Sequence, residues 1–131
     1  MMGEMDLAKL LSNMSPNLKN EEYIFASVGL DKADAVLKHK PLGTFIEDEG
    51  LTVVVEKQIA EELGLFFENT YRCITLQVHS SLQAVGLTAA VSKKLADNAI
   101  SANVIAGFYH DHIFVPAKDA LNAERLLNEL G

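Results

Sequence analysis

The order of predicted elements in the second half of the chain is compatible with few folds. Apolar spacing predicts a strand over residues 71–78, a helix over 86–99, strands over 102–108 and 112–115, and a helix over 119–130. In the first of these strands, Ile74, Leu76 and Val78 form the apolar face that we expect to point inward. One further strand, before or after these elements, would complete a split β-α-β pattern of the ferredoxin-like type.

The first half of the chain predicts a shorter version of the same order. Its elements are a helix over residues 6–14, a strand over 23–28, a weak helix over 32–38, strands over 44–46 and 51–55, and a helix over 58–63 ending at Gly64. Residues 65–68 either add a strand or join the two halves. Laid over each other, the halves align Phe45 with Phe108 and Asp48 with Asp111, and the first copy lacks 13 residues around its helix.

These patterns predict an α+β protein of two ferredoxin-like units in tandem, the first of them abbreviated. We expect the first unit to span residues 1–68 and the second residues 69–131. Because each unit is too small to bury much apolar surface alone, we expect a shared core and a homo-oligomer, a dimer or a tetramer.

Charge is distributed unevenly between the halves. Residues 1–70 hold 13 acidic and 6 basic side chains, whereas residues 71–131 hold 5 of each, so the first half accounts for the net charge of -7. An acidic chain lacks the positive field that nucleic acid or an anionic membrane requires. The single cysteine, Cys73, permits no internal disulfide, and neither a leader sequence nor a membrane-spanning apolar run is evident. We expect a cytoplasmic protein with no nucleic-acid partner and no membrane insertion.

Several strings resemble the ACT domain family. Residues 79–90, reading HSSLQAVGLTAA, resemble the first strand-to-helix loop of an ACT domain, and residues 100–104 resemble its second strand. The strings HDHIFVP at 110–116 and FIEDEGLT at 45–52 extend this to a small bacterial family of uncharacterised tandem ACT-like proteins. The resemblance covers residues 7–130. It implies βαββαβ modules that often bind an amino acid and regulate an attached enzyme. We expect this chain to stand alone and to act in trans.

The strand-to-helix loop is the main candidate site. Backbone N–H groups at the start of a helix, with serine hydroxyls beside them, can receive a carboxylate or a phosphate. The predicted ligand-binding residues are His79, Ser80, Ser81, Leu82, Val85 and Gly86 of the loop, Asn103 of the next strand and Glu49 of an acidic turn. A ligand carboxylate would meet the loop amides at the interface of the units, and a ligand amine would meet Glu49 or Asn103. In the alternative interpretation, one serine caps the helix, Gly86 eases packing and Asn103 bonds to neighbouring backbone.

Other polar clusters carry weaker hypotheses. His110 and His112 share one side of a strand and could ligate a metal, but a zinc site needs three or four protein ligands, and a turn shaped by Asp111 is favoured. The acidic run Glu47-Asp48-Glu49 reads as a solvated turn. No catalytic motif occurs, and no cofactor is expected.

The leading hypothesis is therefore a non-enzymatic regulatory module that binds an amino acid or a similar small carboxylate. A structural module that dimerises or docks on an enzyme or transporter is the alternative. A small enzyme or metal protein using His79, His110 and His112 is the third.

Overall fold

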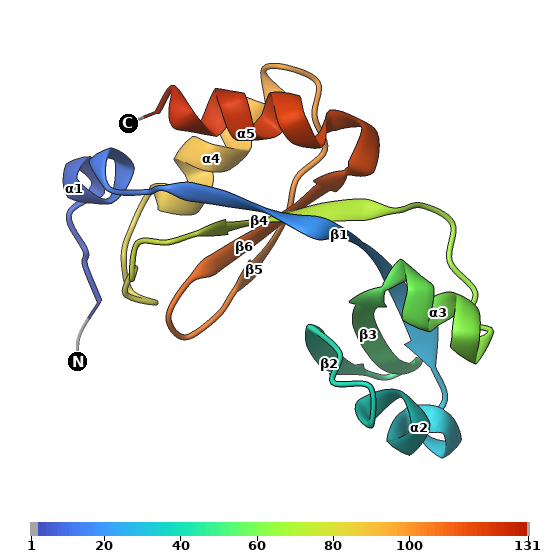
Figure 1. Cartoon of the computed structure of the whole chain (residues 1–131). Coiled ribbons are helices and arrows are strands. Elements are labelled where there is room, and N and C mark those ends of the chain that lie inside the picture. Colours follow the sequence, from blue (N-terminus) through green and yellow to red (C-terminus); the bar gives the residue numbers. More distant parts are fainter. Residues whose placement is uncertain (1–2, 131) are drawn as a thin grey trace. The chain divides into compact units, whose positions relative to one another are not determined.

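The helices and strands follow the predicted order (Figure 1). The computed structural model describes residues 3–130. Its elements are α1 (Leu7–Ser12), β1 (Pro16–Val28), α2 (Ala33–Leu37), β2 (Gly43–Glu47), β3 (Gly50–Glu56), α3 (Lys57–Leu63), β4 (Tyr71–Leu76), α4 (Leu87–Ala96), β5 (Asn103–Ala106), β6 (Asp111–Pro116) and α5 (Ala120–Asn128), with short 3₁₀ turns at Leu30–Lys32 and Ala117–Asp119. The α+β class and the two tandem units are confirmed.

Two compact units divide the chain, and one of them is discontinuous in sequence. The split unit contains the described residues up to Asn20 together with those from Arg72 onward, and the central unit contains residues 21–71. Strand β1 contributes its first residues, from Pro16 to Asn20, to the split unit and the remainder to the central unit. The units defined by packing therefore differ from the two units expected from the sequence repeat, which meet after residue 68.

The split unit obtains its fourth strand from the start of the chain. Its strand order is β1-β4-β6-β5, with β5 antiparallel to β6. The Gln77 amide donates to the Met14 carbonyl at 2.9 Å, and Arg72 Nε donates to the Lys19 carbonyl at 2.9 Å. These two contacts bring the start of β1 alongside β4 in antiparallel direction. The strand that completes the β-α-β pattern therefore comes first in the sequence, and the central unit separates it from the other strands of the split unit.

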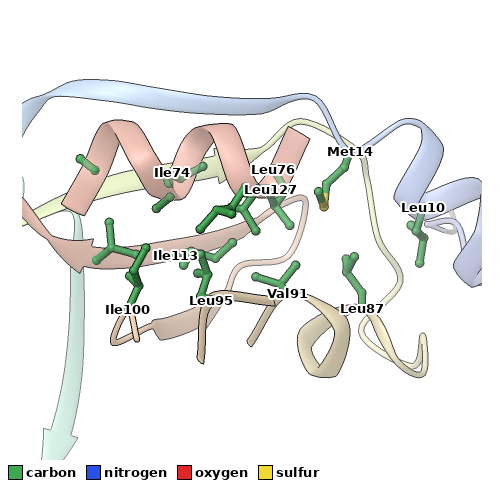
Figure 2. Packing of buried hydrophobic residues seen from close by; sticks show 14 residues of the cluster. Leu10, Met14, Ile74, Leu76, Leu87, Val91, Leu95, Ile100, Ile113 and Leu127 are labelled. Carbon is green, nitrogen blue, oxygen red and sulfur yellow. The ribbon is translucent and has the colours of Figure 1, made fainter. Parts of the chain in front are cut away.

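The core of the split unit lies between this sheet and its helices (Figure 2). Ile74 and Leu76 of β4 pack there as predicted, with Val78 partly buried beside them. Helices α4 and α5 pack on each other and supply the buried side chains Leu87, Val91, Leu95, Ala120, Ala123, Leu126 and Leu127. Replacing one such leucine by alanine costs about 2–5 kcal/mol of stability, so this core accounts for much of the stability of the unit.

Strand β4 is buried on both of its faces, which the sequence pattern did not predict. Cys73 and Thr75 point away from the helices and are nonetheless buried. Thr75 is satisfied there because its hydroxyl forms a hydrogen bond of 2.9 Å with Nδ1 of His112 on β6. Burial raises the pKa of the Cys73 thiol, which keeps it protonated and unreactive at neutral pH.

The central unit has a three-stranded sheet of order β2-β3-β1, antiparallel throughout. Its small core combines Ile24, Val36, Val53, Val55 and Ala60 from β1, α2, β3 and α3. Helix α2 has five residues where α4 has ten, as expected for the abbreviated copy. Gly64 ends α3 with a φ of 67°, the left-handed conformation predicted for it. Residues 65–70 form no strand and join the units.

Candidate functional site

The loop before α4 borders a cleft that lies wholly within the split unit. The cleft has a volume of about 120 Å³. The loop contributes Ser80, Ser81, Leu82, Ala84 and Gly86, helix α4 contributes Leu87 and Thr88, and the neighbouring strands contribute Ala106 and Asp111. The structure thus brings together four of the predicted residues, namely Ser80, Ser81, Leu82 and Gly86, with residues of β5 and β6.

Gly86 sets the direction in which α4 leaves the loop. Its φ of 102° lies in the region that favours glycine, and a Cβ there would lie 3.1 Å from Cδ2 of Leu7. The first backbone bond of the helix runs from the Ala90 amide to the Gly86 carbonyl. Within the described chain, the amides of Leu87, Thr88 and Ala89 have no backbone acceptor. These three N–H groups lie at the positive end of a ten-residue helix.

The start of the chain is bound to the same loop. The Glu4 amide donates to the His79 carbonyl at 2.8 Å, and the Ser81 amide donates to the Glu4 carbonyl at 2.9 Å. Gly3 lies so close that an added Cβ would be 2.5 Å from the Ser81 nitrogen. Residues 3–7, here called the N-terminal arm, therefore fix the conformation of the loop.

Both serines already make local hydrogen bonds. Ser81 Oγ accepts from the Gln83 amide at 3.1 Å, and Ser80 Oγ donates to the Ser81 carbonyl at 3.3 Å. Ser80 is nearly buried, whereas Ser81 is partly exposed in the cleft. The Ser81 hydroxyl stabilises the turn that leads into the helix and keeps its proton available as a donor.

Asp111 is a cleft residue that sequence reasoning assigned to a turn. The turn is residues 107–110, closed by a 2.9 Å bond from the Gly107 amide to the His110 carbonyl, and Asp111 begins β6 opposite Ala106. Because side chains alternate along a strand, Asp111 shares a face with buried Ile113. Partial burial raises the pKa of its carboxyl, and the nearby His112 and His110 oppose that rise. In the sequence, the alternation of Asp111 with the apolar Ile113 could have indicated that this carboxylate lies on the inward face of the strand.

The remaining predicted residues do not line this cleft. His79 packs its ring against Tyr109 and Phe108, with centroid distances of 5.2 and 6.3 Å. Val85 is 81% exposed. Asn103 is exposed at the opposite end of β5 from Ala106, about 10 Å away along the strand. Glu49 belongs to the central unit, in the exposed turn between β2 and β3.

The two histidines of the β5–β6 hairpin make structural contacts. His110 Nδ1 lies 3.4 Å from the Val78 carbonyl, and His112 Nδ1 bonds to Thr75. Partial burial lowers the pKa of His112, and the neighbouring His110 and Lys19 lower it further. Among residues 3–130, no three His, Cys, Asp or Glu side chains are arranged to hold a metal ion. No helix in that range is long and apolar enough to cross a membrane.

Comparison with known protein families gives the class of this chain. One ACT domain model matches residues 2–73, and a second ACT domain model matches residues 68–129. The chain therefore belongs to the ACT domain family and carries two such domains in tandem, which confirms the resemblance seen in its sequence.

Solved structures of similar proteins share this arrangement. A protein of unknown function from Vibrio cholerae, described as a possible transport protein, is 49% identical and has a TM-score of 0.83, with 92% of each chain covered. A protein from Agrobacterium tumefaciens is 20% identical, with a TM-score of 0.71 over 88% of this chain and 87% of its own. The ligand-free regulatory subunit of aspartate kinase from Thermus thermophilus is 11% identical, with a TM-score of 0.68 over 91% and 98%. No curated protein matches the sequence.

Proposed function

We propose that this protein is a non-enzymatic regulatory module that binds an amino acid, or a similar small carboxylate carrying an amine, in the cleft before α4. The observation that carries the proposal is that the first residues of α4, whose amides have no backbone acceptor, and the acidic Asp111 line one cleft. A zwitterion carries the two complementary charges, a carboxylate for the amides and an ammonium group for Asp111.

The ligand carboxylate would bind at the start of α4. The amides of Leu87, Thr88 and Ala89 are available there, and the helix dipole favours a negative group. Thr88 is exposed at the cleft and adds a hydroxyl donor, as does Ser81. The cleft volume of about 120 Å³ corresponds to about four water molecules at roughly 30 Å³ each. Small amino acids therefore fit best.

The ligand amine would bind at Asp111, in place of the Glu49 and Asn103 contacts expected from the sequence. An ammonium group beside Asp111 favours the ionised carboxylate and offsets the burial that raises its pKa. Binding therefore releases a proton from the fraction of Asp111 that is protonated. Affinity should fall as the pH is lowered through the pKa of Asp111.

A regulatory role is supported by the family and by the fold. The regulatory subunit of aspartate kinase has the same tandem arrangement at 11% identity, which is a likeness of fold. The sequence contains no recognisable catalytic motif, and the cleft contains no nucleophile paired with a base. The module would act by changing its association with a partner when the ligand is bound.

A thermal-shift screen against the twenty amino acids tests this function. A ligand at 100 times its Kd stabilises the fold by about 2.7 kcal/mol, which raises Tm by several degrees. Asp111→Asn should abolish the shift, whereas Asp34→Asn removes the same charge from an exposed site in the central unit and should preserve it. The proposal fails if no amino acid shifts Tm, or if both variants respond like the wild type.

A second candidate function, an interaction module without a ligand, is favoured by the outer strand of the central unit. Phe45 and Ile46 of β2 are 71% and 78% exposed, and β2 pairs with β3 on one side. Exposed apolar edge strands invite pairing with another chain. Light scattering of the wild type and of Phe45→Lys tests this function: a dimer that becomes a monomer supports it, and a monomeric wild type opposes self-association.

A further inference from the structure

A second cleft, in the central unit, differs in chemistry from the cleft before α4. It has a volume of about 270 Å³ and lies between β1 and the segment that follows α3. Phe25 and Ser27 line it from β1, Phe66, Phe67 and Glu68 line it from the segment, and Tyr71 lines it from the start of β4. All of these residues belong to the central unit.

The cleft exists because the central unit lacks a fourth strand. Residues 65–70 occupy the stretch of chain that leads into β4, yet they form no strand. Gln77 bonds to Met14, and the two strands run antiparallel. The first residue of β4, Tyr71, therefore lies opposite about Asn20, and β4 pairs with no later part of β1. A hollow is left where a paired strand would lie, and side chains line it.

The lining combines aromatic rings with acceptors of positive charge. Phe25 and Tyr71 pack edge to face, with ring centroids 5.4 Å apart, and form a firm aromatic wall. Phe66 stands at the rim and is 80% exposed, an unusual position for a large apolar ring. Glu68 and Asn69 supply a carboxylate and an amide oxygen, and no ion pair to Glu68 forms among the described residues.

The charge of the surrounding unit has one sign. The central unit contains 11 acidic and 4 basic side chains, so it carries the net charge of -7, whereas the split unit is neutral. This field attracts cations and repels carboxylates and phosphates. Aromatic faces bind organic cations through the negative charge of their π-systems.

We propose that this cleft is a binding site for an organic cation, a guanidinium or ammonium group on a short apolar body. The charged group contacts Glu68 and Asn69, and the body packs on Phe66 and the Phe25–Tyr71 wall. The volume suits a group of amino-acid size or smaller, below the range of drug-sized pockets. This site shares no lining residue with the cleft before α4, and it requires a cation but no carboxylate on the ligand.

The test is calorimetric titration of the whole chain with butylguanidinium and with its neutral analogue butylurea. We expect butylguanidinium to bind saturably and butylurea not to bind. Glu68→Gln and Phe66→Ala should each weaken binding by about tenfold or more. Both residues are exposed, so the variants should fold. Glu62→Gln, an exposed acid on α3 outside the cleft, is the matched control and should change the affinity by less than about twofold.

Three results would overturn the proposal: no saturable binding, equal binding of butylurea, or equal loss in Glu62→Gln and Glu68→Gln. The last result would mean diffuse attraction to an acidic surface. A blocked Gly-Arg-Gly peptide distinguishes the source of the cation. Tighter binding of the peptide assigns the cation to a protein side chain, tighter binding of butylguanidinium assigns it to a free small molecule, and either result supports the site.

Discussion

The split unit and the central unit repeat one fold with different amounts of sheet, helix and charge. Among the described residues, the split unit has four strands and a ten-residue helix α4, and the central unit has three strands and a five-residue helix α2. The split unit has no net charge, whereas the central unit has a net charge of -7. The longer helix of the split unit, α4, begins at a cleft that Asp111 also lines. The missing strand in the central unit creates an aromatic hollow. The two copies of the repeat thus contain clefts with different linings.

The core of the split unit should show the largest effect. Leu95→Ala removes a fully buried side chain of α4 and should lower the free energy of unfolding by about 2–5 kcal/mol. Leu121→Ala, at a position 74% exposed on α5, should change it by less than about 0.5 kcal/mol. Urea denaturation of both variants measures the difference. Similar losses in the two would contradict the assignment of this core.

The N-terminal arm should show the next largest effect, because only the split unit depends on it. Gly3→Ala places a Cβ against the backbone of Ser81, so the arm must shift, at a cost of about 1–3 kcal/mol. Gly43→Ala in β2 meets no atom within 4 Å and serves as the matched control. Hydrogen exchange at the Ser81 amide should accelerate in the first variant alone. Unchanged protection there would show that the arm does not hold the loop.

The pH dependence of stability provides a smaller effect in the split unit. The pKa of His112 is lowered in the folded protein, so the unfolded chain binds more protons, and stability falls as pH drops below about 6.5, the ordinary value. His112→Gln should flatten this fall, whereas His39→Gln, at an exposed position, should retain it. Thermal unfolding between neutral and mildly acid pH measures both. A wild-type fall that persists in His112→Gln would rule out this cause.

Asp111 should give a pH dependence of stability opposite to that of His112, because ionisation of its carboxyl lowers stability as the pH rises. Its pKa is raised in the folded protein, so the ionised carboxylate destabilises the fold above the ordinary pKa of 3.8. Asp111→Asn should therefore raise Tm at neutral pH, and the gain should disappear as the pH approaches that value. A variant that is less stable than the wild type at neutral pH would indicate that Asp111 makes favourable contacts in the free protein.

Local signals in the sequence predicted much of the fold. Residues close together in the sequence were enough to predict the end of α3 at Gly64, the inward face formed by Ile74 and Leu76, and the order of the elements. The discontinuous split unit was not predictable in this way, because the pairing of β1 with β4 joins residues more than fifty positions apart. The burial of Thr75 escaped prediction for the same reason, since its partner His112 lies on another strand.

The candidate site was predicted in part. The loop residues Ser80, Ser81, Leu82 and Gly86 are adjacent in sequence and could be grouped from one motif. Asp111 could not be added to them without the register that places it beside Ala106. The cleft at Phe66 was missed entirely, because it arises from a strand that does not form, and an absent pairing leaves no periodic signal.

A nitrogen-15 NMR titration of the whole chain with the twenty amino acids tests whether the cleft before α4 binds an amino acid. We expect one small amino acid to shift the backbone signals of Leu87, Thr88 and Ala89 in a saturable way, and we expect Asp111→Asn to remove the effect. Saturable shifts confined to other residues, or none at any concentration reached, would contradict the assignment of the cleft before α4 as an amino-acid site.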